Sequence, residues 1–330
     1  MKPMTSSFDV LTVGEPMALF AATQAGSLST VADYRRVTAG AELNVATGLA
    51  RLGMRVGYIS RVGNDSFGRF LRDEMVREAI DCRHVTTDDA HPTGFMLKTR
   101  SDDGSDPEVK YFRRGSAASH LSLDDMPVMT TNDGFPARHL HLTGITPALS
   151  AATRELIFTL AMQAREAGAT ISFDPNLRPR LWPSQAEMVE CLNALAAQTA
   201  GTVMPGLAEG RLLTGRDSAQ DIADFYLALG AQQVVVKLGP QGAYFADRHG
   251  RHGTVAAASV EHVVDTVGAG DGFAVGVISG LLEGLSHSDA VARGNFIGAG
   301  VVQFPGDSAG LPRRRQLTCL VSADAEIPAM

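Results

Sequence analysis

The sequence predicts an α/β protein with three layers, in which a mostly parallel central sheet is covered by helices on both faces and accompanied by a small second sheet. Two observations support this prediction. Short apolar segments typical of buried strands alternate along the chain with longer segments of helical period. Two other stretches interrupt this alternation and alternate polar with apolar residues, as half-buried strands do. Buried strands that alternate with helices indicate a parallel sheet covered on both sides.

The first elements follow this alternation from the start of the chain. Residues 8–15 form an apolar segment that ends in a turn, which predicts a strand. Residues 38–53 place their apolar side chains on one helical face, and Gly53 stands where a helix C-cap is expected. Residues 55–62 predict the next strand. A Gly-Asn-Asp-Ser turn at 63–66, which we expect to be structural, then leads into a further helix.

The middle of the chain continues the pattern. No long linker, repeat or low-complexity tract interrupts it, so we expect a single domain over residues 1–330. The expected strands are at 138–143, 169–174, 201–204 and 232–238, with helices near 151–167, 184–198 and 219–229.

Two stretches, at about 15–37 and 92–114, have no helical period. Within the second stretch, residues 93–99 and 108–113 predict a hairpin around a turn at 102–106. Such strands cannot easily join a parallel core. We therefore expect both stretches to form a small sheet of their own.

The composition argues against several classes of function. The chain has 36 acidic and 29 basic residues and a net charge of −7, which argues against a nucleic-acid or membrane partner. The most apolar window, 273–282, is much shorter than the ~20 residues that a membrane-spanning helix needs. The three cysteines are far apart and lack metal-ligand spacing, which is typical of free thiols in a reducing compartment. With no secretory signal expected, the predicted location is cytoplasmic.

The most informative stretch is 265–274, where three glycines fall within five residues and a helix is expected over 274–283. A Gly-rich turn at a helix N-terminus offers unpaired backbone N–H groups and the positive end of the helix dipole. Both favour an anion such as a transferring phosphoryl group. Asp271 places a carboxylate at the same turn, where it is suited to take a proton from an attacking hydroxyl. On spacing alone, an Asp that merely caps the helix is the alternative.

Residues 265–273 resemble the C-terminal signature of the ribokinase-like (PfkB) sugar kinases, a Gly-Ala-Gly-Asp core preceded by Asp-Thr. The resemblance implies that Asp271 is the catalytic base and that Gly268, Ala269 and Gly270 form the anion hole. It also implies a ribokinase-like fold in which the small sheet is a lid over the sugar. Closure of such a lid would exclude water from the reaction.

Residues 38–46 resemble the N-terminal sugar-binding signature of the same family, with Ala39 in place of the first glycine. A glycine permits close backbone approach to a hydroxylated ligand, and the Asn44 amide is both a donor and an acceptor. The resemblance implies that Gly40 and Asn44 bind the sugar. An ordinary N-capped core helix remains the alternative for this stretch.

Residues 171–182 carry a D-x-N-x-R-x-x-L-W pattern that resembles the 2-keto-3-deoxygluconate kinases of this family. We expect Arg178 to bind the carboxylate of a sugar acid, because a planar guanidinium binds a carboxylate in bidentate fashion. Asp174 ends a predicted strand, where α/β sheets bind ligands. Tyr111 and Arg113 are expected to reach the sugar from the lid, although a surface ion pair is the ordinary role of a lone arginine.

The nucleotide is expected next to a buried strand that breaks into a Gly turn, since this turn borders ATP in the family. The resemblance implies the ATP-binding residues Lys237, Gly239, Gly242, Gly268, Gly270 and Asn295.

Glu209 stands where the family has an N-x-x-E motif connected with Mg²⁺, but Gly206 replaces the Asn. Because Mg²⁺ keeps several waters, the expected contact from Glu209 runs through water. Family members often respond to a monovalent cation near the loops at Asp265 and Gly306, which makes K⁺ a further candidate.

The sequence contains no G-x-x-x-x-G-K-[ST] motif and no G-x-G-x-x-G after the first strand, which excludes a P-loop kinase and a dinucleotide-binding fingerprint. The resemblance implies a sugar kinase that transfers the γ-phosphoryl group of ATP to the terminal hydroxyl of 2-keto-3-deoxygluconate. The alternatives are a fructokinase or another keto-sugar or sugar-acid kinase, and a non-catalytic sugar- and nucleotide-binding protein. A homo-oligomer is expected. His139 and His141 are expected to be core or loop residues rather than metal ligands.

Overall fold

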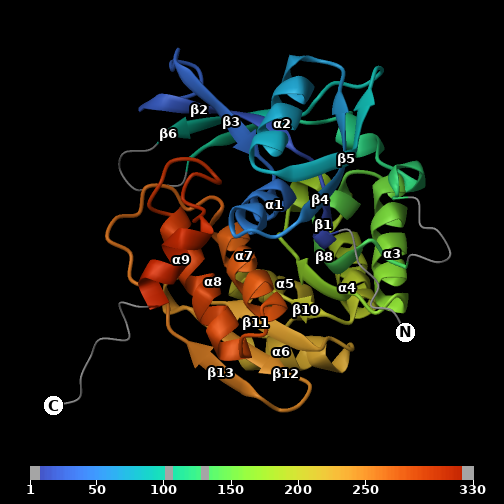
Figure 1. The fold of residues 1–330 in the computed structure, drawn as a ribbon, viewed down its shortest axis with the longest axis vertical. Coiled ribbons are helices and arrows are strands. Elements are labelled where there is room, and N and C mark those ends of the chain that lie inside the picture. The colour runs from blue at the N-terminus through green and yellow to red at the C-terminus, as the bar shows by residue number, and fades with distance from the viewer. Residues whose placement is uncertain (1–7, 101–106, 128–133, 322–330) are drawn as a thin grey trace.

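A nine-stranded sheet runs through the middle of the molecule (Figure 1). The computed structural model describes residues 8–100, 107–127 and 134–321. All neighbouring strands of this sheet are parallel except the two pairs at one edge, β11–β12 and β12–β13. The mostly parallel sheet is thus confirmed. Its strands lie in the order β13 (His252–Val255), β12 (Ala243–Asp247), β11 (Gln233–Lys237), β10 (Thr202–Val203), β9 (Thr170–Asp174), β8 (Ala137–Thr143), β1 (Phe8–Val13), β4 (Val56–Gly63) and β5 (Ile80–Asp88).

Helices cover both faces of the sheet, as predicted. The buried apolar side chains form two main clusters, each built with a different set of helices. Leu160, Leu192 and Tyr226 belong to the first cluster, and Leu49 and Val275 belong to the second. The first cluster is formed with α3 (Ala151–Glu166), α4 (Gln185–Thr199), α5 (Leu207–Thr214) and α6 (Ala219–Ala228), and the second with α1 (Ala41–Arg51), α2 (Ser66–Arg77), α7 (Ala269–Leu282), α8 (His287–Val301) and α9 (Arg314–Val321). Short 3-10 helices lie at η1 (Ala117–His120), η2 (Leu123–Asp125), η3 (Thr146–Ala148), η4 (Pro179–Leu181) and η5 (Gly239–Gln241).

Local sequence explains several of these elements. The centre of β11 consists of three fully buried valines, because β-branched residues suit a strand that is covered on both faces. Serine residues begin several helices. Ser150 and Ser184, for example, each accept a hydrogen bond from a backbone N–H in the first turn of the helix that follows.

Four further strands form the separate small sheet that the sequence predicted, called here the lid sheet. It lies at one end of the molecule, at the top of Figure 1. Met17, Leu19 and Met96 form its own apolar cluster. The expected hairpin is present, and its turn at 102–106 lies outside the described residues. The strand order is β3 (Tyr34–Ala39), β2 (Met17–Ala25), β6 (Phe95–Arg100) and β7 (Val109–Phe112).

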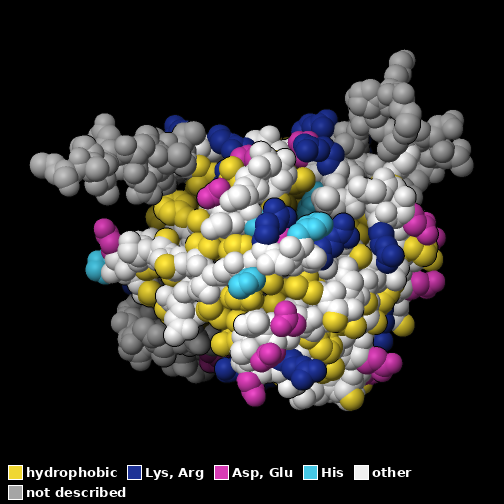
Figure 2. Space-filling model, turned by 90° about the horizontal axis from the view of Figure 1, so that it is seen from below, with side chains coloured by type: hydrophobic (Ala, Val, Ile, Leu, Met, Phe, Trp, Pro, Cys, Tyr) yellow, Lys and Arg dark blue, Asp and Glu magenta, His cyan; other side chains and the backbone are white. Residues whose placement is uncertain are grey.

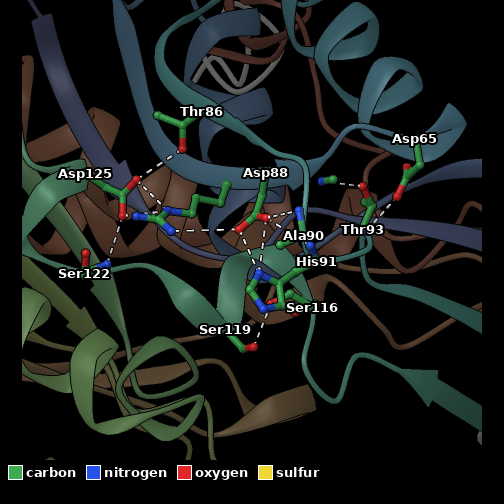
Figure 3. A network of polar contacts seen from close by, with 12 residues as sticks. Asp65, Thr86, Asp88, Ala90, His91, Thr93, Ser116, Ser119, Ser122 and Asp125 are labelled. Atoms are coloured by element: carbon green, nitrogen blue, oxygen red, sulfur yellow. Dashed lines mark hydrogen bonds and ion pairs between the residues drawn. The ribbon is translucent and has the colours of Figure 1, made fainter.

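The start of lid strand β6 is anchored to the core by polar contacts (Figure 3). Asp65 caps α2 through Oδ1, and its Oδ2 accepts a hydrogen bond of 2.8 Å from the backbone N–H of Thr93. The Thr93 hydroxyl in turn accepts the N–H of Gly63 at 2.8 Å. The turn at 63–66 is therefore structural, as expected.

Helix α7 begins earlier than the sequence predicted. It starts at Ala269, five residues before the expected Ala274, so Asp271 lies in its first turn. Glycines normally disfavour a helix, but α7 is buried along most of its length and packs closely against α8. A Cβ on Gly276 would lie 2.5 Å from the Cα of Gly294. Close helix packing therefore requires the glycines that made this segment look irregular.

The surface carries both signs of charge. On the face shown in Figure 2, Lys and Arg side chains are interspersed with Asp, Glu and neutral side chains. No helix formed by the described residues has both the length and the apolar character needed to cross a membrane. Cys82 and Cys191 are free thiols.

Candidate active site

A cavity of about 420 Å³ lies where the parallel strands end, between the core and the lid sheet. Ligands bind at this edge of α/β sheets, beside the point where successive strands diverge. Here β1 has β8 on one side and β4 on the other. Most of the predicted site residues line the cavity: Gly40, Asn44, Tyr111, Arg113, Asp174, Arg178, Glu209, Lys237, Gly268, Gly270 and Asp271.

Asp271 lies in the first turn of α7 and contacts Asn44 of α1. Asn44 Nδ2 donates a hydrogen bond of 2.7 Å to Oδ2 of Asp271, and Asn176 Nδ2 lies 3.5 Å from Oδ1. The pKa of Asp271 is raised to about 7, chiefly because the carboxyl is buried. The hydrogen bond from Asn44 opposes this rise. Within the described part of the chain Asp271 is in no ion pair, so its carboxylate can accept a proton near neutral pH.

Gly268 precedes α7 with a φ of 87°, a left-handed conformation that favours glycine. A Cβ at this position would lie 2.3 Å from the carbonyl oxygen of Asp307. The turn brings Gly268 and Gly270 to the cavity wall. The first N–H groups of a helix have no partner within it, so the start of α7 offers donors and the positive end of a dipole to an anion in the cavity.

Asp174 and Lys237 form an ion pair at the ends of β9 and β11, with 2.6 Å between Lys237 Nζ and Asp174 Oδ2. Burial alone would lower the pKa of Lys237, but the combined attraction of Asp174, Glu209 and Asp271 outweighs burial and raises the pKa. Lys237 is thus a fixed positive charge in the cavity wall. The other oxygen of Asp174 accepts the Asn176 N–H at 3.1 Å. Contact between Asp174 and a sugar stays a prediction.

The loop after β9 contains Asn176 in the left-handed region, with a φ of 40°, which is uncommon for a residue other than glycine. Arg178 follows it and lines the cavity. Arg178 Nη1 donates to the carbonyl oxygen of Leu177 at 2.9 Å. No acidic side chain of the described residues forms an ion pair with Arg178, so its guanidinium charge is available to a ligand.

Arg113 differs from Arg178 because it is buried and forms an ion pair with Glu15. Glu15 also accepts a hydrogen bond from the hydroxyl of Ser116. Arg113 therefore already has a carboxylate partner within the chain. Tyr111 of β7 and Met96 of β6 complete the lid wall of the cavity.

Glu209 reaches the cavity, but both of its oxygens are engaged. Oε2 accepts the Gly206 N–H at 2.7 Å and Oε1 accepts the Leu177 N–H at 2.8 Å. Glu209 thereby ties the loop after β9 to α5. No group of three or more His, Cys, Asp or Glu side chains within the described residues could hold a metal ion. A role for Glu209 towards Mg²⁺ stays a prediction and fits a contact through water.

Three of the expected ATP-binding residues are not among those that line the cavity: Gly239, Gly242 and Asn295. Gly242 packs against β13, where a Cβ would lie 2.0 Å from the carbonyl oxygen of Val255. Asn295 Nδ2 donates to the same oxygen at 3.1 Å and to that of Ala256 at 2.9 Å. Both residues hold the end of β13, and their contact with a nucleotide stays a prediction.

His139 and His141 are buried core residues, as expected. Burial lowers the pKa of each to about 3, so both are neutral. Each ring lies 2.8 Å from the hydroxyl of Ser172.

Sequence reasoning missed Lys98, which lines the cavity from lid strand β6. Its Nζ lies 2.5 Å from Oδ2 of Asp265 and 3.1 Å from Oδ1 of Asp307. A signal was present, because Lys98 falls two residues after Met96 and so shares its buried face. A lysine at an inward position of a half-buried strand indicates a charged partner.

Residues 7–314 match a family model described as pfkB family carbohydrate kinase. The chain belongs to this family. The kinase is 50% identical over 321 residues to a 2-dehydro-3-deoxygluconokinase of Bacillus subtilis (strain 168), an alignment that covers 97% of each chain.

Solved structures agree with this assignment. A PfkB protein from Polaromonas sp. JS666 is 46% identical to the kinase, with a TM-score of 0.84 over 94% of this chain and 99% of that one. A double mutant of the fructokinase from Vibrio cholerae O395, bound to fructose, ADP and a potassium ion, is 27% identical with a TM-score of 0.82, and the match covers 96% and 99% of the two chains. The expected ribokinase-like architecture is confirmed.

Proposed function

We propose that the kinase transfers the γ-phosphoryl group of ATP to the terminal hydroxyl of 2-keto-3-deoxygluconate, the sugar acid named in its B. subtilis relative. One observation carries the proposal. A buried carboxylate with a pKa of about 7 lies at a helix N-terminus, in the same cavity as Arg178, which forms no ion pair among the described residues. The first group suits proton removal during phosphoryl transfer, and the second suits a substrate with a carboxylate.

Asp271 is the general base in this proposal. The substrate hydroxyl attacks the γ-phosphorus and gives its proton to Asp271, while the bond to the bridging oxygen breaks and ADP leaves. The Asn44 hydrogen bond holds one carboxylate oxygen. Oδ1 of the Asn44 amide is buried without a partner among the described residues, so it can accept a hydrogen bond from a sugar hydroxyl beside the base.

The start of α7 stabilises the transferring group. The N–H groups at Gly268, Ala269 and Gly270 and the helix dipole favour the charge that spreads over the phosphoryl oxygens. Lys237 adds a positive charge in the same wall. Glu209 would help to hold Mg²⁺ through water, and the bound ion would supply positive charge to the nucleotide phosphates. The adenine side of ATP is proposed near Gly239, Gly242 and Asn295.

The carboxylate of the sugar acid binds Arg178 in this proposal. Arg113 is a weaker candidate than it was on the sequence alone, because Glu15 already neutralises it. Arg113 then shapes the lid wall with Tyr111, next to Gly40 at the start of α1. The lid sheet excludes water when it covers the site.

Two other functions fit the site less well. The V. cholerae structure with fructose supports a keto-sugar kinase as the second candidate. Fructose has no carboxylate, so it would not use the guanidinium of Arg178, which forms no ion pair within the described part of the chain. A binding protein without turnover is disfavoured because Asp271 keeps a pKa suited to a base.

A substrate panel tests the proposal. ATP consumption is measured with 2-keto-3-deoxygluconate, gluconate and fructose, for the natural chain and for Arg178→Ala. We expect turnover with the keto acid, and a KM for it that rises about 10–100-fold in the variant, because a bidentate charge-assisted contact is lost. The matched control is Arg180→Ala, an exposed arginine of η4. Turnover with fructose that Arg178→Ala leaves unchanged would favour the second candidate.

We also propose a cytoplasmic homo-oligomer, as the composition and family suggest. Light scattering of the purified protein measures the number of subunits.

A further inference from the structure

Lys98 links the lid sheet to the loops around the anion-binding turn. It belongs to β6, and its ammonium lies between the carboxylates of Asp265 and Asp307 at 2.5 and 3.1 Å. All three side chains are almost fully buried, with exposed fractions of 3%, 9% and 5%. Such a cluster is costly to bury unless it is paired, so its position calls for an explanation.

The two aspartates hold the turn that precedes α7. Oδ1 of Asp265 accepts the Val267 N–H at 3.1 Å, and Oδ2 accepts the Gly306 N–H at 3.2 Å. The backbone of Asp307 packs against Gly268 so closely that no side chain fits there. The shape of the turn therefore depends on the two loops that carry Asp265 and Asp307.

The two carboxylates repel one another unless a cation lies between them. Burial raises the pKa of Asp307, the charge of Lys98 lowers it, and the charge of Asp265 raises it. The ammonium of Lys98 is in direct contact with both groups. Its removal would leave two like charges in a site with little water.

A potassium ion would need the same oxygens. The V. cholerae fructokinase structure holds potassium, and the family resemblance suggests a monovalent cation near Asp265 and Gly306. In this chain the oxygens of Asp265 are taken by Lys98 and by two backbone N–H groups. A second cation beside the ammonium would be repelled. The described residues therefore do not fit potassium at this pair of carboxylates.

We propose that Lys98 takes the place of the monovalent cation, as a positioning residue on the lid that holds the loops at 265–268 and 306–308 and so forms the anion-binding turn without potassium. The charge is then built into β6 rather than drawn from solution. The inference rests on the proposed kinase activity for its kinetic measurements only, since its thermal measurements need no turnover.

The first experiment uses the natural chain. Turnover and Tm are measured in KCl and in tetramethylammonium chloride at equal ionic strength. We expect kcat to agree within about twofold and Tm to be the same, since the cation is supplied by the protein. Activation by potassium of more than about tenfold would overturn the proposal.

The second experiment removes the charge in Lys98→Met, which keeps the length of the side chain. In tetramethylammonium chloride we expect kcat to fall about 10–100-fold, as for the loss of a preorganised charge. KCl should restore part of kcat and raise the Tm of this variant, while the Tm of the natural chain does not change. The control is Lys110→Met, an exposed lysine of neighbouring strand β7, which should behave as the natural chain in both salts.

If Lys98→Met does not fold, the double variant Lys98→Met/Asp307→Asn replaces it, because it leaves only one unpaired carboxylate. The same recovery with KCl is expected. Two results would refute the role of Lys98. One is a kcat of the folded variant in tetramethylammonium chloride that equals the kcat of the natural chain. The other is a change of Tm with KCl that is the same for the variant and the natural chain. Absence of turnover in every protein would count against the proposed function, and the Tm comparison would still decide the question of Lys98.

Discussion

Asn44 and Asp271 are 227 residues apart in the chain, and the amide of one donates a 2.7 Å hydrogen bond to the carboxylate of the other. The contact joins the start of α1 to the start of α7, and both helix starts face the same cavity. It fixes the orientation of the proposed base and favours its charged form.

Replacement of Asp271 by Asn should remove the base and keep the shape of the site. We expect kcat to fall by roughly 10²–10⁴-fold, with ATP affinity largely retained, since proton transfer contributes about this much and the amide is isosteric. Steady-state kinetics and nucleotide titration measure the two effects. A turnover number equal to that of the natural chain would remove Asp271 from its role.

The pH profile of kcat/KM should report the protonation of Asp271. We expect an acid limb with a midpoint near its pKa of about 7, because the base is active only when deprotonated. In Asn44→Ala the hydrogen bond that lowers this pKa is lost, so the midpoint should move to higher pH. A midpoint that stays in place or moves down would mean that Asn44 does not stabilise the charged carboxylate.

Asp271 should also make the folded chain less stable as pH rises. Its folded pKa of about 7 lies above the ordinary 3.8, so the folded chain binds more protons than the unfolded chain between these values. The contribution of Asp271 to the free energy of unfolding is therefore greatest at low pH, and it is lost as the pH rises through 7. Relative to the natural chain, Asp271→Asn should gain about 1–3 kcal/mol of unfolding free energy between about pH 5 and about pH 8. Urea denaturation at both values measures the gain, and an unchanged difference would contradict it.

Two glycines of the anion-binding turn should respond differently to substitution by Ala. At Gly268 the left-handed backbone and the Asp307 carbonyl, 2.3 Å from a Cβ, both oppose a side chain. We expect Gly268→Ala to destabilise the fold by about 1–3 kcal/mol. At Gly270 the nearest atom to a Cβ is Lys237 Nζ at 3.6 Å, so Gly270→Ala should retain its stability. If Gly268→Ala and Gly270→Ala lowered the Tm by the same amount, the turn would not be held in this way.

Most of the central sheet could be predicted from sequence because buried parallel strands are apolar over their whole length. The predicted 138–143 and 169–174 agree with β8 and β9 to within one residue. The strands β5, β12 and β13 were missed. Most residues of the edge strands β5 and β13 are exposed or half-buried, and both β12 and β13 pair antiparallel. The early start of α7 was missed because the low helix propensity of three glycines argues against a helix there. Only the close packing of α7 against α8 explains why glycines occur in this helix.

The site was predictable where one short segment carries the chemistry, as in the turn that ends at Asp271. It was not predictable where the chemistry depends on partners from distant segments. The sequence favoured Arg178 over Arg113 because Arg178 follows the end of a predicted strand. Only the fold shows that Glu15 pairs with Arg113, and that Arg178 is in no ion pair with an acidic residue of the described chain. Lys98 lies 167 residues from Asp265, and no local pattern connects them.

The position of β1 in the sheet has a consequence for how the chain is made. Among the strands of this sheet it comes first in the chain, and in the finished sheet it lies between β8 and β4. Every later strand of this sheet then joins an edge that is still open, first β4 and β5 on one side, then β8 to β13 in turn on the other. No strand has to push between two that are already paired, so the sheet can assemble as synthesis proceeds. Asp271, the proposed base, follows β13 in the chain, so the proposed site can form only after the strands of its scaffold have been made.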